Sequence, residues 1–84
     1  MTVQVYLFAQ LAEVADAKFL HLELPAEPTS VRNLMQKYCE SNPALATLLF
    51  DSDISVAVNK KFASWDTVLN CGDEVGFLPP VSGG

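Results

Sequence analysis

The sequence is poor in the residues that metal, redox and nucleic-acid chemistry depend on. It has a single histidine, His21, and two cysteines, Cys39 and Cys71, which form no Cys-x-x-Cys pair. Zinc and dithiol redox sites need such clusters, so we expect neither, and we expect two free thiols instead of a disulfide. Only 5 Lys and Arg residues stand against 10 Asp and Glu residues, a formal net charge of −5. Nucleic acids are bound by clustered Lys and Arg side chains, so we expect no nucleic-acid partner for this acidic chain and favour a basic protein partner.

Long apolar runs and glycine-rich loops are also missing. No apolar stretch approaches the roughly 20 residues of a membrane-spanning helix, and the start lacks a signal-peptide pattern, so we expect a cytoplasmic protein without membrane contact. The chain has no phosphate-binding glycine loop, so any ATP used in its chemistry must be bound by another protein. With 84 residues, half of them hydrophobic, the chain has room for one small domain.

Alternating apolar residues predict most of the extended segments. Strands are expected at 3–8, 18–24, 54–58 and 74–78, with a brief extended piece at 62–64. Asn59, Lys60 and Lys61 form a polar turn, for which a solvated hairpin tip is favoured over a docking patch, and Gly72 marks the turn before the last strand. The residues expected to face inward are Val3, Val5, Leu7, Leu20, Leu22, Leu24, Ile54, Val56 and Val58.

One main helix is predicted over residues 30–41. Thr29 or Ser30 is its candidate N-cap, and an apolar stripe recurs at helical spacing. Shorter helical turns are expected at 9–15 and after the Asn42-Pro43 pair, which combines an N-cap residue with proline at the first helical position. The stripe of the main helix consists of Val31, Leu34, Met35 and Tyr38.

This order of elements predicts an α+β domain with one main helix on one face of a mixed sheet of four to five strands. If the first and last strands lie side by side and parallel, the fold is a ubiquitin-like β-grasp, and the chain leaves the sheet from a central strand. We therefore divide the chain into a domain, residues 1–78, and a C-terminal tail, residues 79–84.

The tail is the predicted functional segment. Pro79 and Pro80 fix φ and lack a backbone N–H, so the strand cannot simply continue, and about 15 Å of extended chain can follow. Such a tail suits insertion into the active site of another protein, and Gly84 carries the terminal carboxylate as the reactive group. The alternative is a frayed, inert terminus. The residues predicted to insert are Pro80, Val81, Ser82 and Gly83.

Residues 69–84 resemble the ending of a known family, which has the pattern G-D-E-V, an apolar pair, then P-P-V-S-G-G. The family comprises the small, sulfur-carrying subunits of molybdopterin synthase, which are related to the thiamine sulfur carrier and more distantly to ubiquitin. Residues 6–13 resemble its first strand and helical turn, and 56–59 its strand ending in asparagine. The chain departs from the family pattern at three positions. It has Ala12 where an arginine is common, Asp16 where a glycine is common, and Cys71 where a polar or acidic residue is more usual; we have no functional account of Cys71.

The resemblance implies a carrier that is not catalytic alone. An adenylating enzyme of the ubiquitin-activating type would use ATP to form a Gly84 adenylate, and a persulfide donor would convert it into a thiocarboxylate. The tail would then enter the large subunit, in an assembly of two small and two large subunits, and give sulfur to cyclic pyranopterin monophosphate (precursor Z). Alternatives are a sulfur carrier for thiamine synthesis or tRNA thiolation, a ubiquitin-like protein modifier, or an interaction module with an inert tail.

Other candidate residues are assigned by position. His21 alternates with core leucines and is expected on the surface of a strand, not as a general base. Asp73 and Glu74 are expected to cap a turn and to be solvated. An apolar patch on the helix-free face of the sheet is predicted to bind the large subunit and, exclusively, the activating enzyme. The residues predicted for this interface are Phe8, Phe77, Leu78 and Pro79.

Overall fold

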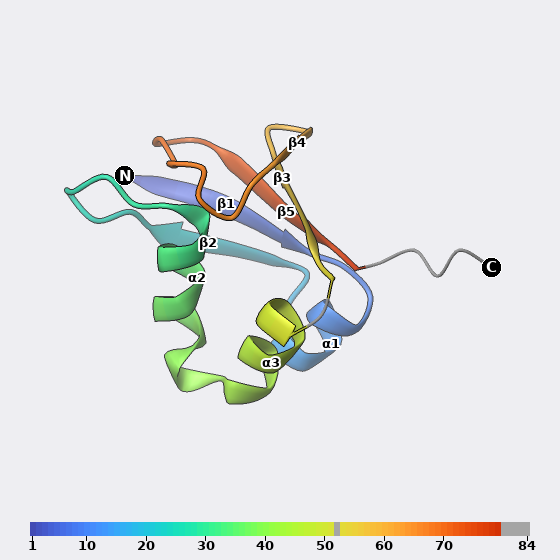
Figure 1. Ribbon diagram of the computed structural model, residues 1–84. Coiled ribbons are helices and arrows are strands. Elements are labelled where there is room, and N and C mark those ends of the chain that lie inside the picture. Colours follow the sequence, from blue (N-terminus) through green and yellow to red (C-terminus); the bar gives the residue numbers. More distant parts are fainter. Residues whose placement is uncertain (52, 80–84) are drawn as a thin grey trace.

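The computed structural model describes residues 1–51 and 53–79, and in these residues five strands form one mixed sheet with three α-helices on one of its faces (Figure 1). The spatial order of the strands is β2-β1-β5-β3-β4. Their bounds are Thr2–Leu7 for β1, Phe19–Glu23 for β2, Ser55–Val58 for β3, Lys61–Ala63 for β4 and Glu74–Leu78 for β5. The helices are Gln10–Ala15 for α1, Val31–Tyr38 for α2 and Pro43–Asp51 for α3.

The strand pairing confirms the predicted topology. β1 pairs antiparallel with β2 and parallel with β5, while β3 pairs antiparallel with both β4 and β5. β5 is therefore the central strand, and it ends at Leu78. The chain beyond this residue starts from the middle of the sheet, as the β-grasp prediction requires.

The core lies between the sheet and the helices. The inward residues of β1 are at most 2% exposed, because successive side chains of a strand point to opposite faces. The predicted apolar stripe of α2 covers them, with three buried residues and the half-buried Tyr38. Buried residues of this core include Val3, Val5, Leu7, Leu11, Val31, Leu34, Met35, Leu45, Leu49, Val56, Val75 and Phe77.

Polar side chains cap the first turns of α2 and α3. The Ser30 hydroxyl accepts a hydrogen bond from the backbone N–H of Asn33 at 3.1 Å, so Ser30 and not Thr29 is the N-cap of α2. The Asn42 side chain accepts from the N–H of Leu45 at 3.2 Å and donates to the carbonyl of Val14 at 3.3 Å, which ties α3 to α1. The main helix is shorter than predicted, because α2 ends at Tyr38 and continues as a 3₁₀ turn, Cys39–Ser41.

Phe77 does not lie on the helix-free face, so its prediction as an interface residue is wrong. Its side chain is fully buried, and its ring stacks on Trp65 with a centroid distance of 5.3 Å. The reason is the two-residue period of a strand: Val75 and Phe77 face the helices, and their neighbours face the opposite side. Phe77 and Leu78 therefore have different roles, although they are adjacent in the sequence.

Candidate functional site

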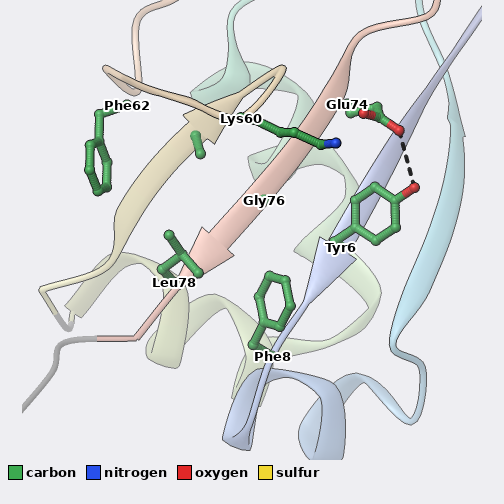
Figure 2. Close-up of a pocket in the computed structure, with 8 residues that line it drawn as sticks. Tyr6, Phe8, Lys60, Phe62, Glu74, Gly76 and Leu78 are labelled. Atoms are coloured by element: carbon green, nitrogen blue, oxygen red, sulfur yellow. Dashed lines mark hydrogen bonds between the residues drawn. The ribbon is translucent and has the colours of Figure 1, made fainter.

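The face of the sheet opposite the helices carries a groove of about 480 Å³ (Figure 2). Its floor is formed by Gly76 of β5 and Ala57 of β3, and its sides by the rings of Phe8, Phe62 and Tyr6. Leu78 lies at the end where β5 finishes. The remaining lining residues, at the other end, are Lys60 and Glu74.

The strand register explains why this face is concave. One cross-strand row runs over the whole sheet, because Phe62 pairs with Ala57, Ala57 with Gly76, Gly76 with Tyr6, and Tyr6 with Phe19. The two small residues stand in the middle of the row, and aromatic residues stand on both sides of them. The groove is therefore a direct result of side-chain size along one row of paired residues.

Gly76 deepens the groove, although the packing of the chain would also allow a side chain at this position. A Cβ built at this position would meet only the Phe8 Cε2 atom, at 3.8 Å, which is an ordinary van der Waals distance. Glycine weakens the interior of a strand, and there it often marks a place where a ligand or another backbone comes close. The missing side chain at Gly76 thus points to an occupant of the groove.

The polar end of the groove contains a hydrogen-bonded acid. The Tyr6 hydroxyl lies 3.3 Å from Glu74 Oε2 and 3.1 Å from Gln4 Oε1, and it donates to one of them at a time. Desolvation and the nearby Glu74 carboxylate raise the pKa of Tyr6, so its hydroxyl stays a neutral donor. Glu74 is half-buried at the start of β5, and its carboxylate accepts from Tyr6 and does not cap the turn.

The turn between β3 and β4 positions the side of the groove that faces away from β1. Asn59 and Lys60 both have positive φ, 53° and 68°, as in the two-residue hairpin turns that match the sheet twist. The Asn59 amide donates to Asp73 Oδ1 at 2.9 Å, and its oxygen accepts from the Glu74 N–H at 3.0 Å. Asp73 also accepts from the Asn70 N–H at 2.7 Å, which confirms its predicted turn-capping role.

The structure brings some of the predicted interface residues together. Phe8 is 45% exposed and Leu78 is half-buried, and both line the groove; Pro79 follows directly and is half-buried. Sequence reasoning missed Phe62, which at 81% is the most exposed large hydrophobic residue in the described part of the chain, and it missed the role of Gly76. Pairing 61–63 with 56–58 across the Asn59-Lys60 turn would have placed Phe62 on this face.

The predictions for the tail concern residues outside the described part of the chain. Pro80, Val81, Ser82, Gly83 and Gly84 all follow the last described residue, Pro79.

The two cysteines and the histidine lie apart from the groove. Cys39 and Cys71 are free, as predicted; Cys39 is buried, and desolvation raises the pKa of its thiol, whereas Cys71 is exposed. His21 is exposed on β2, as predicted, with its ring 4.8 Å from that of Phe19. Within residues 1–51 and 53–79, no cluster of three or more His, Cys, Asp or Glu side chains has the arrangement of a metal site. The helices of this described part are all too short or too polar to cross a membrane.

The strand order and the parallel pairing of β1 with β5 define a ubiquitin-like β-grasp protein with an open groove on its helix-free face. Residues 5–84 match the sequence model of the ThiS family, and the chain belongs to this family of small sulfur carriers, which are not catalysts by themselves.

Individual relatives cover nearly the whole chain. The molybdopterin synthase sulfur carrier subunit of Escherichia coli (strain K12) is 35% identical over 82 residues, which cover 98% of this chain and 99% of the relative. Small archaeal modifier protein 1 of Haloferax volcanii is 33% identical over 84 residues and covers 93% of this chain and 95% of its own. A crystal structure of the Haloferax volcanii modifier superposes with a TM-score of 0.84 at 30% identity, covering 100% of both chains.

Proposed function

We propose that the chain is the sulfur-carrying subunit of a molybdopterin synthase and acts in the cytoplasm. The observation that carries this proposal is the position of β5. This central strand ends at Leu78, and Leu78 also borders the groove, so a protein bound in the groove lies beside the start of the tail. A docked partner would thereby receive the tail and its terminal carboxylate. The 35% identity with the Escherichia coli carrier supports the choice of pathway.

The proposed chemistry begins with activation of the Gly84 carboxylate. A carboxylate is a poor acyl donor, so it first attacks the α-phosphate of ATP on an activating enzyme, which releases pyrophosphate and leaves an acyl adenylate. A persulfide then attacks the acyl carbon and expels AMP. A thiol reduces the resulting acyl disulfide, so that a thiocarboxylate remains on Gly84.

The loaded carrier would then deliver its sulfur on the large subunit. The thiocarboxylate sulfur forms a bond to a carbon of cyclic pyranopterin monophosphate (precursor Z) as an oxygen substituent leaves that carbon, and water then cleaves the acyl–sulfur bond, which regenerates the Gly84 carboxylate. One dithiolene needs two sulfur atoms, so two loaded carriers are used, in an assembly of two small and two large subunits. Pro80, Val81, Ser82 and Gly83 would occupy the channel that leads to the active site.

The groove is the proposed docking surface for both partners. Phe8, Leu78 and Pro79 keep their predicted interface role, and Phe62 replaces Phe77 on the basis of its exposure. Because the activating enzyme and the large subunit would use the same surface, they would bind one after the other and not together. Sulfur loading and sulfur delivery would therefore be separate steps.

The test is the intact mass of the chain after coexpression with an activating enzyme and a persulfide donor. We expect the mass change of one oxygen replaced by sulfur, confined to the C-terminal peptide. A variant that lacks Gly84 serves as the matched control and should stay unmodified. Repeated recovery of the unmodified mass alone, with an active enzyme and donor, would refute the proposal.

A second candidate is protein modification, favoured by the 33% identity with small archaeal modifier protein 1. The same activated Gly84 would then be attacked by the amine of a lysine on another protein, and an isopeptide bond would form. Mass spectrometry of proteins captured with the tagged chain distinguishes the two candidates, because only modification leaves a Gly84 remnant on lysine. Carriers for thiamine synthesis or tRNA thiolation share the thiocarboxylate and are separated by the acceptor that takes the sulfur.

A further inference from the structure

We infer that a protein docked in the groove places a cationic side chain, an arginine or a lysine, against Glu74 at the polar end. The inference rests on the proposed function, because it requires that a partner covers the groove. It goes further by naming the chemical group of the partner that this end of the groove recognises.

The polar end of the groove has more hydrogen-bond acceptors than donors close to Tyr6. The Tyr6 hydroxyl lies 3.3 Å from Glu74 Oε2 and 3.1 Å from Gln4 Oε1, but it has only one proton to donate. Among the described residues, no donor is hydrogen-bonded to Glu74 Oε1. Turning the Gln4 amide would supply a donor to Tyr6 and would leave Glu74 Oε1 unchanged. This end of the groove therefore offers acceptor oxygens to a partner.

The Glu74 carboxylate is held in place at this end. The backbone N–H of Glu74 donates to the Asn59 side chain at 3.0 Å, its carbonyl accepts from the Asn59 N–H at 2.7 Å, and the residue is half-buried. A partner that covers the groove removes water from this carboxylate. Burying an ionised carboxylate is costly unless an opposite charge or hydrogen-bond donors replace the water. A partner that binds well must therefore bring such a group to Glu74.

Lys60, the other charged residue of the groove, makes no such demand. It comes from the β3–β4 turn and lines the same end of the groove as Glu74 (Figure 2). Ion pairs among the described residues join Met1 with Glu23 and Arg32 with Asp66, so Lys60 and Glu74 are not paired. Lys60 is exposed, and a long lysine side chain can turn its ammonium group to water while its stem stays on the protein. Covering the groove therefore requires a counter-charge for Glu74 and none for Lys60.

The net charge of the chain favours a partner cation as well. A formal charge of −5 attracts a basic surface and raises its rate of association. The groove itself is apolar over Gly76, between the rings of Phe8 and Phe62. The matching surface of the partner is thus an apolar side chain for this hollow, next to a cation for Glu74.

The experiment is isothermal titration calorimetry of the full chain with a molybdopterin synthase large subunit and, separately, with an activating enzyme. Glu74→Gln should weaken binding at least about tenfold, because the amide has the size of the carboxylate but no charge. Added salt should weaken binding of the natural chain more than binding of this variant. Glu74→Asp keeps the charge but draws it back by one methylene group, so its affinity should lie between the two.

Glu40→Gln is the matched control for net charge. Glu40 is exposed in the 3₁₀ turn on the helix side and does not line the groove, so this variant should bind nearly as tightly as the natural chain. Circular dichroism confirms that each variant is folded.

Lys60→Gln tests the alternative that Lys60 itself neutralises Glu74 in the complex. With a partner cation at Glu74, this variant should tighten binding by up to about threefold, because it removes a like charge beside that cation. If Lys60 were the neutralising group, its loss would weaken binding about as much as Glu74→Gln does, and the inference would be wrong.

Undiminished binding of Glu74→Gln, or an equal loss of affinity in Glu40→Gln, would also overturn the inference. Either result leaves the proposed function intact, because the natural chain still binds its partners and sulfur loading of Gly84 is measured separately. A natural chain that binds neither protein refutes the proposed docking, and the inference with it.

Discussion

The two faces of the sheet use the same kinds of residue for opposite purposes. On the helix side, Phe77 is fully buried and stacked on Trp65, whereas on the open side Phe62 is 81% exposed and borders a groove. The free energy of burying an aromatic ring is already used for folding at Phe77 and is still available for binding at Phe62. Hydrophobicity alone therefore does not separate core residues from exposed groove residues in this chain; the face of the sheet on which a residue lies does.

The largest expected effect is on stability at Phe77. Phe77→Ala should lower the free energy of unfolding by about 3–5 kcal/mol, because it leaves a cavity between the sheet and Trp65. The same substitution at Phe62 should change stability by less than about 0.5 kcal/mol, as is usual for exposed positions. Urea denaturation followed by Trp65 fluorescence measures both. Equal destabilisation by the two variants would remove the distinction between the faces.

For partner binding, in contrast to stability, the large effect is expected at Phe62. Phe62→Asp should weaken binding to a large subunit or activating enzyme at least about thirtyfold, because it places a charge in the apolar side wall of the proposed docking groove. Val68→Asp is the matched control, since Val68 is 54% exposed and does not line the groove. Isothermal titration calorimetry gives both affinities. Undiminished binding of Phe62→Asp would place the docking surface elsewhere.

Removing the Asn59 side chain, which joins the β3–β4 turn to Asp73 and Glu74, should have an intermediate effect on stability. Asn59→Gly keeps the positive φ of the turn but removes the side-chain hydrogen bonds to Asp73 and Glu74, and it should cost about 1–2 kcal/mol of stability. Asn59→Ala should cost more, because alanine adds strain at this φ. Thermal unfolding compares them. If Asn59→Gly is as stable as the natural chain, the side-chain bonds do not hold the turn.

The sequence predicted the fold well and the groove only in part. Alternation and helical spacing identified the strands and helices, and the proline pair and Gly84 drew attention to the tail. The groove depends on cross-strand pairing of Phe62 with Ala57 and of Ala57 with Gly76, and periodicity along one segment does not contain the register between segments. The assignment of Phe77 failed for a simpler reason, since strict alternation with Leu78 already separates the two residues.

The smallest expected change in stability belongs to the floor of the groove, and it separates the two faces most cleanly. Gly76→Val replaces a poor strand former by a good one where a Cβ has room, so stability should stay equal or rise by up to about 1 kcal/mol. The new methyl groups would fill the hollow between Phe8 and Phe62, so partner affinity should fall at least about tenfold. Gly76→Ala is the graded control and should lie between Val and the natural residue in both measurements. A valine variant that is more stable and binds its partners as tightly as before would show that the hollow is unoccupied in the complexes.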